Sequence, residues 1–193
     1  MNLTVVFDQF PQLQTERLVL REITTADREA VYNVFRTAEV VRYYDVKQFK
    51  AIEKADNIIE HFQQKYNKRR AVRWGIALRE NPAWLIGSCG YNVLDPFAYF
   101  GEIGYELHPA YWRQGLMTEA VAALLRFGFE EVGLYRIEAN LFKGNLASAG
   151  VLTKLGFQLE GTLRERELWN GERFDLEWYG LLREDYDSRK LSK

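Results

Sequence analysis

A strand that stops at a proline and then turns tightly into a long helix constrains the fold of this chain more than any other feature. Residues 99–107 are predicted to form a strand, Pro109 stops it, and residues 113–115 form a turn that opens a helix expected over 114–132. The unpaired N–H groups and the positive dipole end of that helix would then face one point, where an anion such as a pyrophosphate is stabilised. Gly115 has no Cβ, so phosphate oxygens can approach the main chain. The alternative stays open that Gly115 merely makes a tight turn before a core helix.

Hydrophobic periodicity and turn residues predict the other elements. Strands are expected over 17–23, 72–78, 84–94, 99–107, 135–142, 157–168 and 174–182, and helices over 24–35, 47–66, 114–132 and 145–155. The pairs Asn81-Pro82, Asp95-Pro96 and Asn170-Gly171 are interpreted as turns between strands. Helices interrupt the strands in two regions, and this order favours an α/β architecture with a mixed sheet and helices on both faces.

Composition narrows the class of protein. The chain has 193 residues, 47% of them hydrophobic, and no low-complexity tract, so one domain over residues 1–193 is expected. Lys and Arg number 26 against 27 Asp and Glu, which argues against a nucleic-acid partner. The single cysteine permits no intramolecular disulfide, and neither a signal sequence nor a run of ~20 apolar residues is present. A soluble cytoplasmic protein with no membrane partner is the expectation.

Several segments together resemble one family. Residues Glu102 to Ala120 resemble the acetyl-coenzyme A signature of the GNAT superfamily, in the version with an aromatic pair before the turn and Thr-Glu-Ala after it. The later half resembles the ribosomal-protein N-terminal-alanine acetyltransferases. It does so through Asn145-Leu-Ala-Ser148, Leu155-Gly-Phe157, Leu159-Glu-Gly161 and Asn170-Gly-Glu-Arg-Phe-Asp175. With Thr15-Glu-Arg-Leu-Val-Leu-Arg21 the resemblance covers nearly the whole chain, and it depends on the order and spacing of these segments.

The resemblance implies a GNAT-like mixed, mostly antiparallel central sheet of about seven strands, with helices on both faces and a splayed central strand pair. It implies acetyl-CoA as cosubstrate and no metal. The pyrophosphate would be held by the main chain of Arg113, Gln114, Gly115, Leu116, Met117 and Thr118. The main chain of Leu107, beside the splay, would bind the pantetheine and the acetyl carbonyl. The sequence departs from the commonest family turn at Trp112 and Met117; main-chain donors are unaffected by this, whereas close packing of the helix against the cofactor is put in question.

The expected reaction is direct attack of an amine on the thioester through a tetrahedral intermediate. An α-amine with a pKa of ~7.7–8.0 is roughly a third neutral near pH 7.5, whereas a lysine amine is only about 0.1% neutral, a difference of roughly 3–4 kcal/mol. A modest carboxylate base therefore suits an N-terminal α-amine best.

Glu167 is the candidate base, placed by its match to an acidic residue eight positions after Leu159 in the resembling family. It would accept the proton of the amine directly or through a water. The alternative is that residues 164–167 form an alternating charged strand surface with a cross-strand partner such as Arg173. Glu106, at the end of its strand, is a further residue that could face the amine.

Two residues near the start of the 145–155 helix match the family's site. Ser148 matches the family's proposed general acid, whose hydroxyl would protonate or hydrogen-bond the leaving thiolate; otherwise it is an ordinary first-turn residue. Asn145 is the strongest helix-cap candidate, since its side chain can accept from the N–H of residue 147 or 148. An asparagine here also contacts the cofactor in the resembling family, and the two roles are compatible.

The cysteine and the histidines are not expected to take part in catalysis or metal binding. Cys89 lies inside an apolar strand, where a buried thiol is the ordinary outcome, and two histidines with one cysteine do not favour a metal site. Most of the aromatic residues are expected in the core, and some could line an acceptor channel. These aromatic residues are Tyr43, Tyr44, Trp74, Tyr91 and Trp169.

The main functional hypothesis is acetylation of a protein N-terminus, with a ribosomal protein as the implied substrate. Acetylation of a small amine (an amino acid, polyamine or drug) is an alternative that uses the same scaffold, and a non-catalytic acetyl-CoA-binding module is a third. A phosphate loop that hydrolyses nucleotides is disfavoured because no Gly-Lys-Ser or Gly-Lys-Thr follows the turn. Dimerisation is common in the family, so a homodimer formed through the final hairpin stays open.

Overall fold

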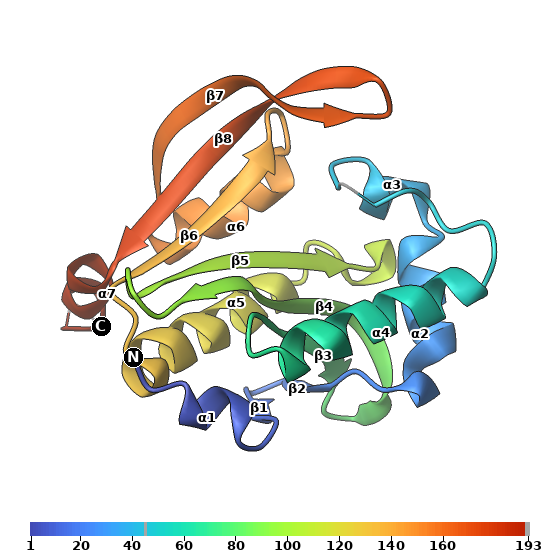
Figure 1. The fold of residues 1–193 in the computed structure, drawn as a ribbon, viewed down its shortest axis with the longest axis horizontal. Coiled ribbons are helices and arrows are strands. Elements are labelled where there is room, and N and C mark those ends of the chain that lie inside the picture. The colour runs from blue at the N-terminus through green and yellow to red at the C-terminus, as the bar shows by residue number, and fades with distance from the viewer. Residues whose placement is uncertain (45, 192–193) are drawn as a thin grey trace.

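An eight-stranded sheet runs through the whole molecule (Figure 1). The computed structural model describes residues 1–44 and 46–191. The strand order is β1-β2-β3-β4-β5-β6-β8-β7, and every neighbouring pair is antiparallel except β5 and β6. The strands are β1 Leu13–Gln14, β2 Leu18–Glu22, β3 Val72–Leu78, β4 Asn81–Asp95, β5 Phe100–Leu107, β6 Arg136–Phe142, β7 Gln158–Trp169 and β8 Glu172–Leu182.

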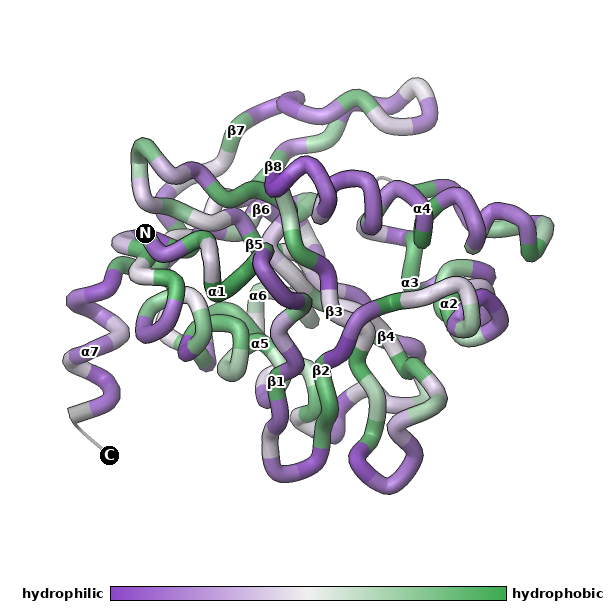
Figure 2. The backbone as a smooth tube through the Cα atoms, turned by 60° about the horizontal axis from the view of Figure 1, so that its bottom comes forward, coloured by the Kyte–Doolittle hydropathy of each residue, from purple (hydrophilic) through white to green (hydrophobic). Residues whose placement is uncertain are grey.

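Helices cover both faces of this sheet. They are α1 Thr4–Phe7, α2 Arg28–Phe35, α3 Ala38–Val41, α4 Glu53–Asn67, α5 Leu116–Arg126, α6 Leu146–Leu155 and α7 Arg183–Leu191. The last turns of α5 continue as a π-helix over Phe127–Val132. Alternate residues of the strands pack in opposite directions: Trp74 and Ile76 join a core with α5, whereas Ala77 and Leu85 join a second core with α2 and α4. Most residues of α4 and α7 are hydrophilic (Figure 2).

The parallel pair in the middle of the sheet is very short. Register pairs join β5 to β6 only at Phe100↔Arg136, Gly101↔Ile137 and Glu102↔Glu138. Beyond this point β5 continues to Leu107 on β4, and β6 continues to Phe142 on β8. The two strands therefore part toward their C-terminal ends, which confirms the expected splay.

A long hairpin of β7 and β8 projects from the edge of the sheet (Figure 1). Its turn is Asn170-Gly171, and both residues have positive φ angles of 51° and 84°, as a two-residue hairpin turn requires. Most residues of β7 are exposed to solvent. The pairing of β7 with β8 is irregular between Leu163 and Glu167, so the strand carries a bulge there.

The expected elements are confirmed with several corrections. The helix expected from residue 47 begins at Glu53, because residues 47–52 form a connection in which the Phe49 N–H donates to the Phe35 carbonyl. The turn expected at Asn81-Pro82 lies instead at residues 79–80, and Asn81 and Pro82 are the first two residues of β4. The sheet has eight strands where about seven were expected. The additional strand, β1, is only two residues long, which is too short to give a pattern in the sequence. Three helices, α1, α3 and α7, were not expected from the sequence; α1 and α3 are too short to produce a helical period.

No helix in the described part of the chain is long and apolar enough to cross a membrane.

Candidate active site

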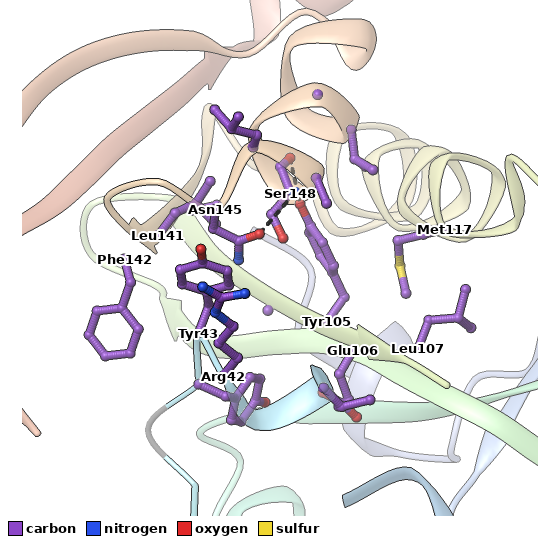
Figure 3. Close-up of a pocket in the computed structure, with 18 of the residues that line it drawn as sticks. Arg42, Tyr43, Tyr105, Glu106, Leu107, Met117, Leu141, Phe142, Asn145 and Ser148 are labelled. Atoms are coloured by element: carbon purple, nitrogen blue, oxygen red, sulfur yellow. Dashed lines mark hydrogen bonds between the residues drawn. The ribbon is translucent and has the colours of Figure 1, made fainter. Parts of the chain in front are cut away.

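A cavity of about 950 Å³ opens where β5 and β6 part (Figure 3). We name its two ends by the helices beside them. The α5 end comprises Leu107 and residues 111–113, 115–118, 144–148, 150 and 151. The α3 end comprises residues 39, 40 and 42–44 together with Asn92, Glu102, Gly104, Glu106 and Glu167.

The α5 end is built from a turn with unusual backbone angles. Gly115 is the N-cap of α5 with φ 76°, and Arg113 is also left-handed with φ 60°. The first N–H of α5 that donates to a main-chain carbonyl is that of Glu119, to Gly115 at 3.0 Å. Within the described residues, the N–H groups of 113–118 donate no hydrogen bond to the protein. These amides are therefore available to an anion at the positive end of α5.

A carboxylate clamp holds this turn in place. Glu119 Oε1 accepts from the Thr15 hydroxyl at 2.5 Å and from the Arg17 N–H at 2.8 Å, while Oε2 accepts from Arg17 Nε at 2.7 Å. Arg17 Nη1 also donates to the Gln114 carbonyl at 3.0 Å. Burial by itself raises the pKa of Glu119, but the hydrogen bonds from Thr15 and Arg17 outweigh it and lower the pKa. The segment before β2 thus fixes the start of α5.

Leu107 directs its main chain into the gap between the strands. The His108 N–H donates to the Ile86 carbonyl at 2.8 Å, which makes Leu107 and Gly87 a non-hydrogen-bonded pair. The N–H and C=O of Leu107 therefore point away from β4. The carbonyl accepts from Trp112 Nε1 at 2.6 Å, and this bond ties the strand end to the turn before α5.

The start of α6 forms the wall that faces α5. Asn145 is the N-cap, and its Oδ1 accepts from the Ser148 N–H at 3.3 Å, so the predicted capping is confirmed. The Tyr105 hydroxyl donates to the Ser148 carbonyl at 3.2 Å, and burial raises the pKa of that tyrosine. Ser148 lines the cavity, and a hydrogen bond with its side chain partly offsets the effect of burial on the pKa of Tyr105.

At the α3 end a buried ion pair forms the floor. Arg73 donates to Glu106, and the Ser88 hydroxyl donates to the other Glu106 oxygen. Arg73 also contacts Ser88 Oγ at 2.8 Å and the Tyr44 hydroxyl at 3.1 Å. Burial lowers the pKa of Arg73, but the Glu106 carboxylate has the opposite effect and the pKa lies above its usual range. Glu106 is therefore fully engaged by its neighbours, which sequence reasoning did not detect; the signal was an arginine inside an otherwise apolar strand.

Glu102 is a second acidic group at this end, in the last register pair of β5 and β6, where it lies opposite Glu138. Burial and the nearby Glu138 carboxylate raise its pKa, against weaker effects of the Asn140 and Asn92 amides. Within the described residues Glu102 takes part in no ion pair, whereas Glu138 pairs with Arg136 at 2.9 Å. The cavity therefore has an acidic side chain that takes part in no ion pair within the described residues where the strands part.

Glu167 reaches the cavity from β7, opposite Phe174 of β8. Phe174 packs against Phe142 of the cavity wall, with ring centroids 5.2 Å apart. The Glu167 carboxylate is half-buried and has no hydrogen bond or ion pair among the described residues. The alternative in which Arg173 pairs with Glu167 is not what the structure has, because Arg173 Nη1 donates to the Glu165 carbonyl at 3.4 Å.

Most of the predicted site residues lie around this one cavity. Those that line it are Leu107, Arg113, Gly115, Leu116, Met117, Thr118, Asn145, Ser148 and Glu167. Gln114 does not line it; its side chain donates to the Ala110 carbonyl at 3.0 Å, and only its main chain is near the turn.

The aromatic residues divide between core and cavity. Tyr43 and Tyr44 line the α3 end, and Figure 3 shows Tyr43 and Arg42 pointing into the cavity. Trp74 and Tyr91 are fully buried in the core. Trp169 does not line the cavity. Cys89 is buried, and burial raises the pKa of its thiol, so its place in the core is as expected.

The geometry of the cavity indicates the class of enzyme to which the site belongs. A helix start with free amides, a slot between parted strands and a carboxylate at the far end suit an enzyme that transfers a group from a long anionic donor to a second substrate.

Comparison with known proteins gives the family. Residues 17–158 match the family described as "Acetyltransferase (GNAT) domain". The chain is 40% identical over 174 residues to the uncharacterised N-acetyltransferase YoaA of Bacillus subtilis, covering 90% of this chain and 98% of YoaA. It is also 26% identical over 153 residues to the spermidine N(1)-acetyltransferase of Escherichia coli K12, covering 79% of each. The chain belongs to the GNAT acetyltransferase family and is an acetyltransferase.

Solved structures agree with this fold. A GNAT-family acetyltransferase from Bacillus anthracis superposes with a TM-score of 0.80 at 26% identity, covering 90% of this chain and 99% of that one. The structure of RimL, a ribosomal L7/L12 α-N-protein acetyltransferase in complex with coenzyme A, has a TM-score of 0.80 at 20% identity and covers 89% and 98%. At that identity the second likeness concerns the fold alone.

Proposed function

We propose that this enzyme transfers an acetyl group from acetyl-CoA to the N-terminal α-amine of a protein, with a ribosomal protein as the acceptor. The observation that carries the proposal is the state of Glu167. Its carboxylate is half-buried, free of partners among the described residues and located on the cavity wall. Such a group is a modest base, and it suits an amine that is already partly neutral near pH 7.5.

The α5 end fits the anionic part of acetyl-CoA. The unbonded amides of residues 113–118 and the positive end of α5 would hold a pyrophosphate. Left-handed angles at Arg113 and Gly115 turn these amides toward one place, and the Glu119 clamp keeps the turn fixed. When bound, acetyl-CoA supplies an acetyl group activated as a thioester.

Three residues would act around the slot. The Leu107 N–H points into the gap, where it would stabilise negative charge on a carbonyl oxygen. The Ser148 hydroxyl would donate to the departing sulfur, while Asn145 holds the first turn of α6. Glu167 would take the proton of the acceptor amine directly or through one water.

A specific observation favours a second acceptor class, a small cationic amine. Carboxylates at the α3 end outnumber guanidinium groups, since Glu39, Glu102, Glu106 and Glu167 line it with Arg42, and Arg73 lies behind Glu106. Glu106 and Arg73 neutralise each other. The surplus acidic groups would attract a polyamine as well as a protonated N-terminus, and the spermidine acetyltransferase of E. coli is a relative.

The test presents both acceptor classes to the intact chain with acetyl-CoA. One arm uses three peptides. The first begins with a free alanine, the second begins with a free serine, and the third has a blocked N-terminus and carries a lysine. The other arm uses spermidine and a panel of amino acids. Release of the coenzyme A thiol is measured, and mass spectrometry locates the acetyl group. Acetylation confined to the free peptide N-terminus supports the proposal, whereas turnover with the small amines alone rejects it in favour of the second class.

A further inference from the structure

The bulge in β7 determines where Glu167 lies along the hairpin. Leu163 pairs with Leu176, and the next register pair is Glu167 with Phe174. Residues 164–166 of β7 therefore lie opposite the single residue Asp175 of β8. In a regular ladder Glu165 would lie opposite Phe174, and Glu167 would lie two residues nearer the turn, about 7 Å farther along the strand. The bulge brings the Glu167 carboxylate back to the cavity wall.

The bulge contains an unfavourable backbone conformation. Glu165 has φ 50°, in the left-handed region that non-glycine residues rarely adopt. A conformation of this kind persists when the surrounding structure holds it. The Glu165 N–H donates to Asp175 Oδ1 at 2.9 Å, so the holding group is the carboxylate that lies opposite the bulge.

Asp175 also connects the bulge to the loop before α6. Its Oδ2 contacts Lys143 Nζ at 3.3 Å, and its carbonyl accepts from the Lys143 N–H at 2.9 Å. Lys143 lies between β6 and the Asn145 cap of α6. The hydrogen bond from the Glu165 N–H, with that from Lys143, lowers the pKa of Asp175, as expected for a carboxylate that is used as an acceptor.

We propose that Asp175 is a positioning residue, which holds the β7 bulge in its register and so keeps the Glu167 carboxylate at the cavity. This inference rests on the proposed role of Glu167 as the base. It gives a role to the Asn170-to-Asp175 segment, whose last residue takes no part in the cavity lining. Asp175 acts on catalysis through Glu167, the Lys143 loop helps to hold it, and it does not touch the substrates.

The test compares Asp175→Ala and Asp175→Asn with Glu167→Gln in the full-length enzyme, with Glu172→Gln as a control carboxylate on the same strand. We expect Asp175→Ala to lower kcat by roughly ten- to hundredfold, because a small displacement of a reacting group is costly. The KM for acetyl-CoA should stay within about twofold, because the α5 turn is built separately. Asp175→Asn keeps an acceptor oxygen for the Glu165 N–H and should recover most of the activity. Thermal unfolding checks that each variant is folded.

A double-variant cycle distinguishes positioning from general stability. If Asp175 acts through Glu167, Asp175→Ala causes no further loss of kcat in the Glu167→Gln background, and each single variant changes the pH–rate profile in the same way. An equal loss in both backgrounds with an unchanged profile would overturn the inference, and so would full activity of Asp175→Ala. If Glu167→Gln alone retains wild-type turnover, the proposed base is wrong, which is a separate outcome.

Discussion

The two ends of the cavity are built from different parts of the polypeptide. At the α5 end most polar groups that face the cavity are main-chain amides of one turn, fixed by the Glu119 clamp, and the Ser148 side chain on the facing wall is an exception. At the α3 end they are side chains from four elements: α3 with the segment after it, the strands β4 and β5, and β7 beside its bulge. One end depends on backbone conformation and the other on side-chain identity.

The two kinds of site differ in how strongly they depend on the identity of their side chains. A main-chain site tolerates changes of side chain as long as its turn is preserved, whereas a side-chain site changes its specificity with each substitution. We therefore expect variants at the α5 end to alter donor binding and variants at the α3 end to alter the amine step.

The largest effect is expected for Glu167→Gln at the α3 end. Removal of a general base costs about a hundredfold or more in kcat. The KM for acetyl-CoA should not change, because the donor binds at the other end. Steady-state kinetics over a pH series, with Glu172→Gln beside it, measure this. Retained turnover with an unaltered pH profile would show that the amine step needs no base from β7.

Gly115→Ala should affect the donor alone. At φ 76° a Cβ costs about 1–2 kcal/mol, which corresponds to roughly tenfold weaker binding of acetyl-CoA if the turn relaxes to avoid it. Calorimetric titration gives the dissociation constant. Gly133→Ala is the matched control, because Gly133 has φ 80° but lies at the other end of the α5 segment. Equal affinity in both variants would contradict a main-chain donor site.

Ser148→Ala tests the wall of the cavity that faces α5. A hydrogen bond to a charged leaving group is worth about 1.5–3 kcal/mol, so kcat should fall roughly tenfold or more. The melting temperature should change little, since the Tyr105 hydroxyl can still donate to the main-chain carbonyl of residue 148 in the variant. Thr153→Ala, an exposed change on the same helix, is the control. A change in stability with an intact kcat would make Ser148 a simple helix residue.

Glu102→Gln should change the preference among amines. An incompletely paired carboxylate contributes about 0.2–1 kcal/mol to binding a cation, which amounts to at most about a fivefold rise in KM for a polyamine. The effect should shrink as salt is added. Glu80→Gln, in the β3–β4 turn, serves as the control. A KM for spermidine that is independent of both salt and Glu102 would remove the charge argument for the second acceptor class.

The smallest effect concerns acid stability at the α5 end. The folded protein lowers the pKa of Glu119, so its contribution to stability is present above the unfolded value of ~4.3 and is lost as the pH falls through the folded value. Wild type should therefore lose roughly 2–4 °C more in melting temperature than Glu119→Gln between pH 5.5 and 3.5. Glu131→Gln should follow wild type. Parallel curves for all three would mean that the clamp contributes nothing to folding.

Most of the helices and strands, and the turn at the α5 end, could be predicted from the sequence. Glycine and proline positions and hydrophobic period predict a strand, a turn and a long helix there, and the anion site follows from backbone geometry alone. The splay of β5 and β6 came from family resemblance, because no local pattern marks where a ladder stops.

The α3 end could not be predicted in the same way. Arg73 and Glu106 meet across 33 positions of sequence, and neither strand signals the other. The bulge at Glu165 depends on a carboxylate ten positions away, and α3 is a single turn without a period. Side-chain sites assembled from distant elements leave little trace in a local pattern.

The short contact between β5 and β6 has a consequence for the protein without its substrates. An interior sheet edge that lacks a neighbour exposes polar main-chain groups, and an extended molecule with amide groups can occupy the position of the absent strand. A donor bound in this way would complete the sheet from within. Its binding should slow amide exchange most strongly in residues 103–107 and 139–142, on the two facing borders of the opening.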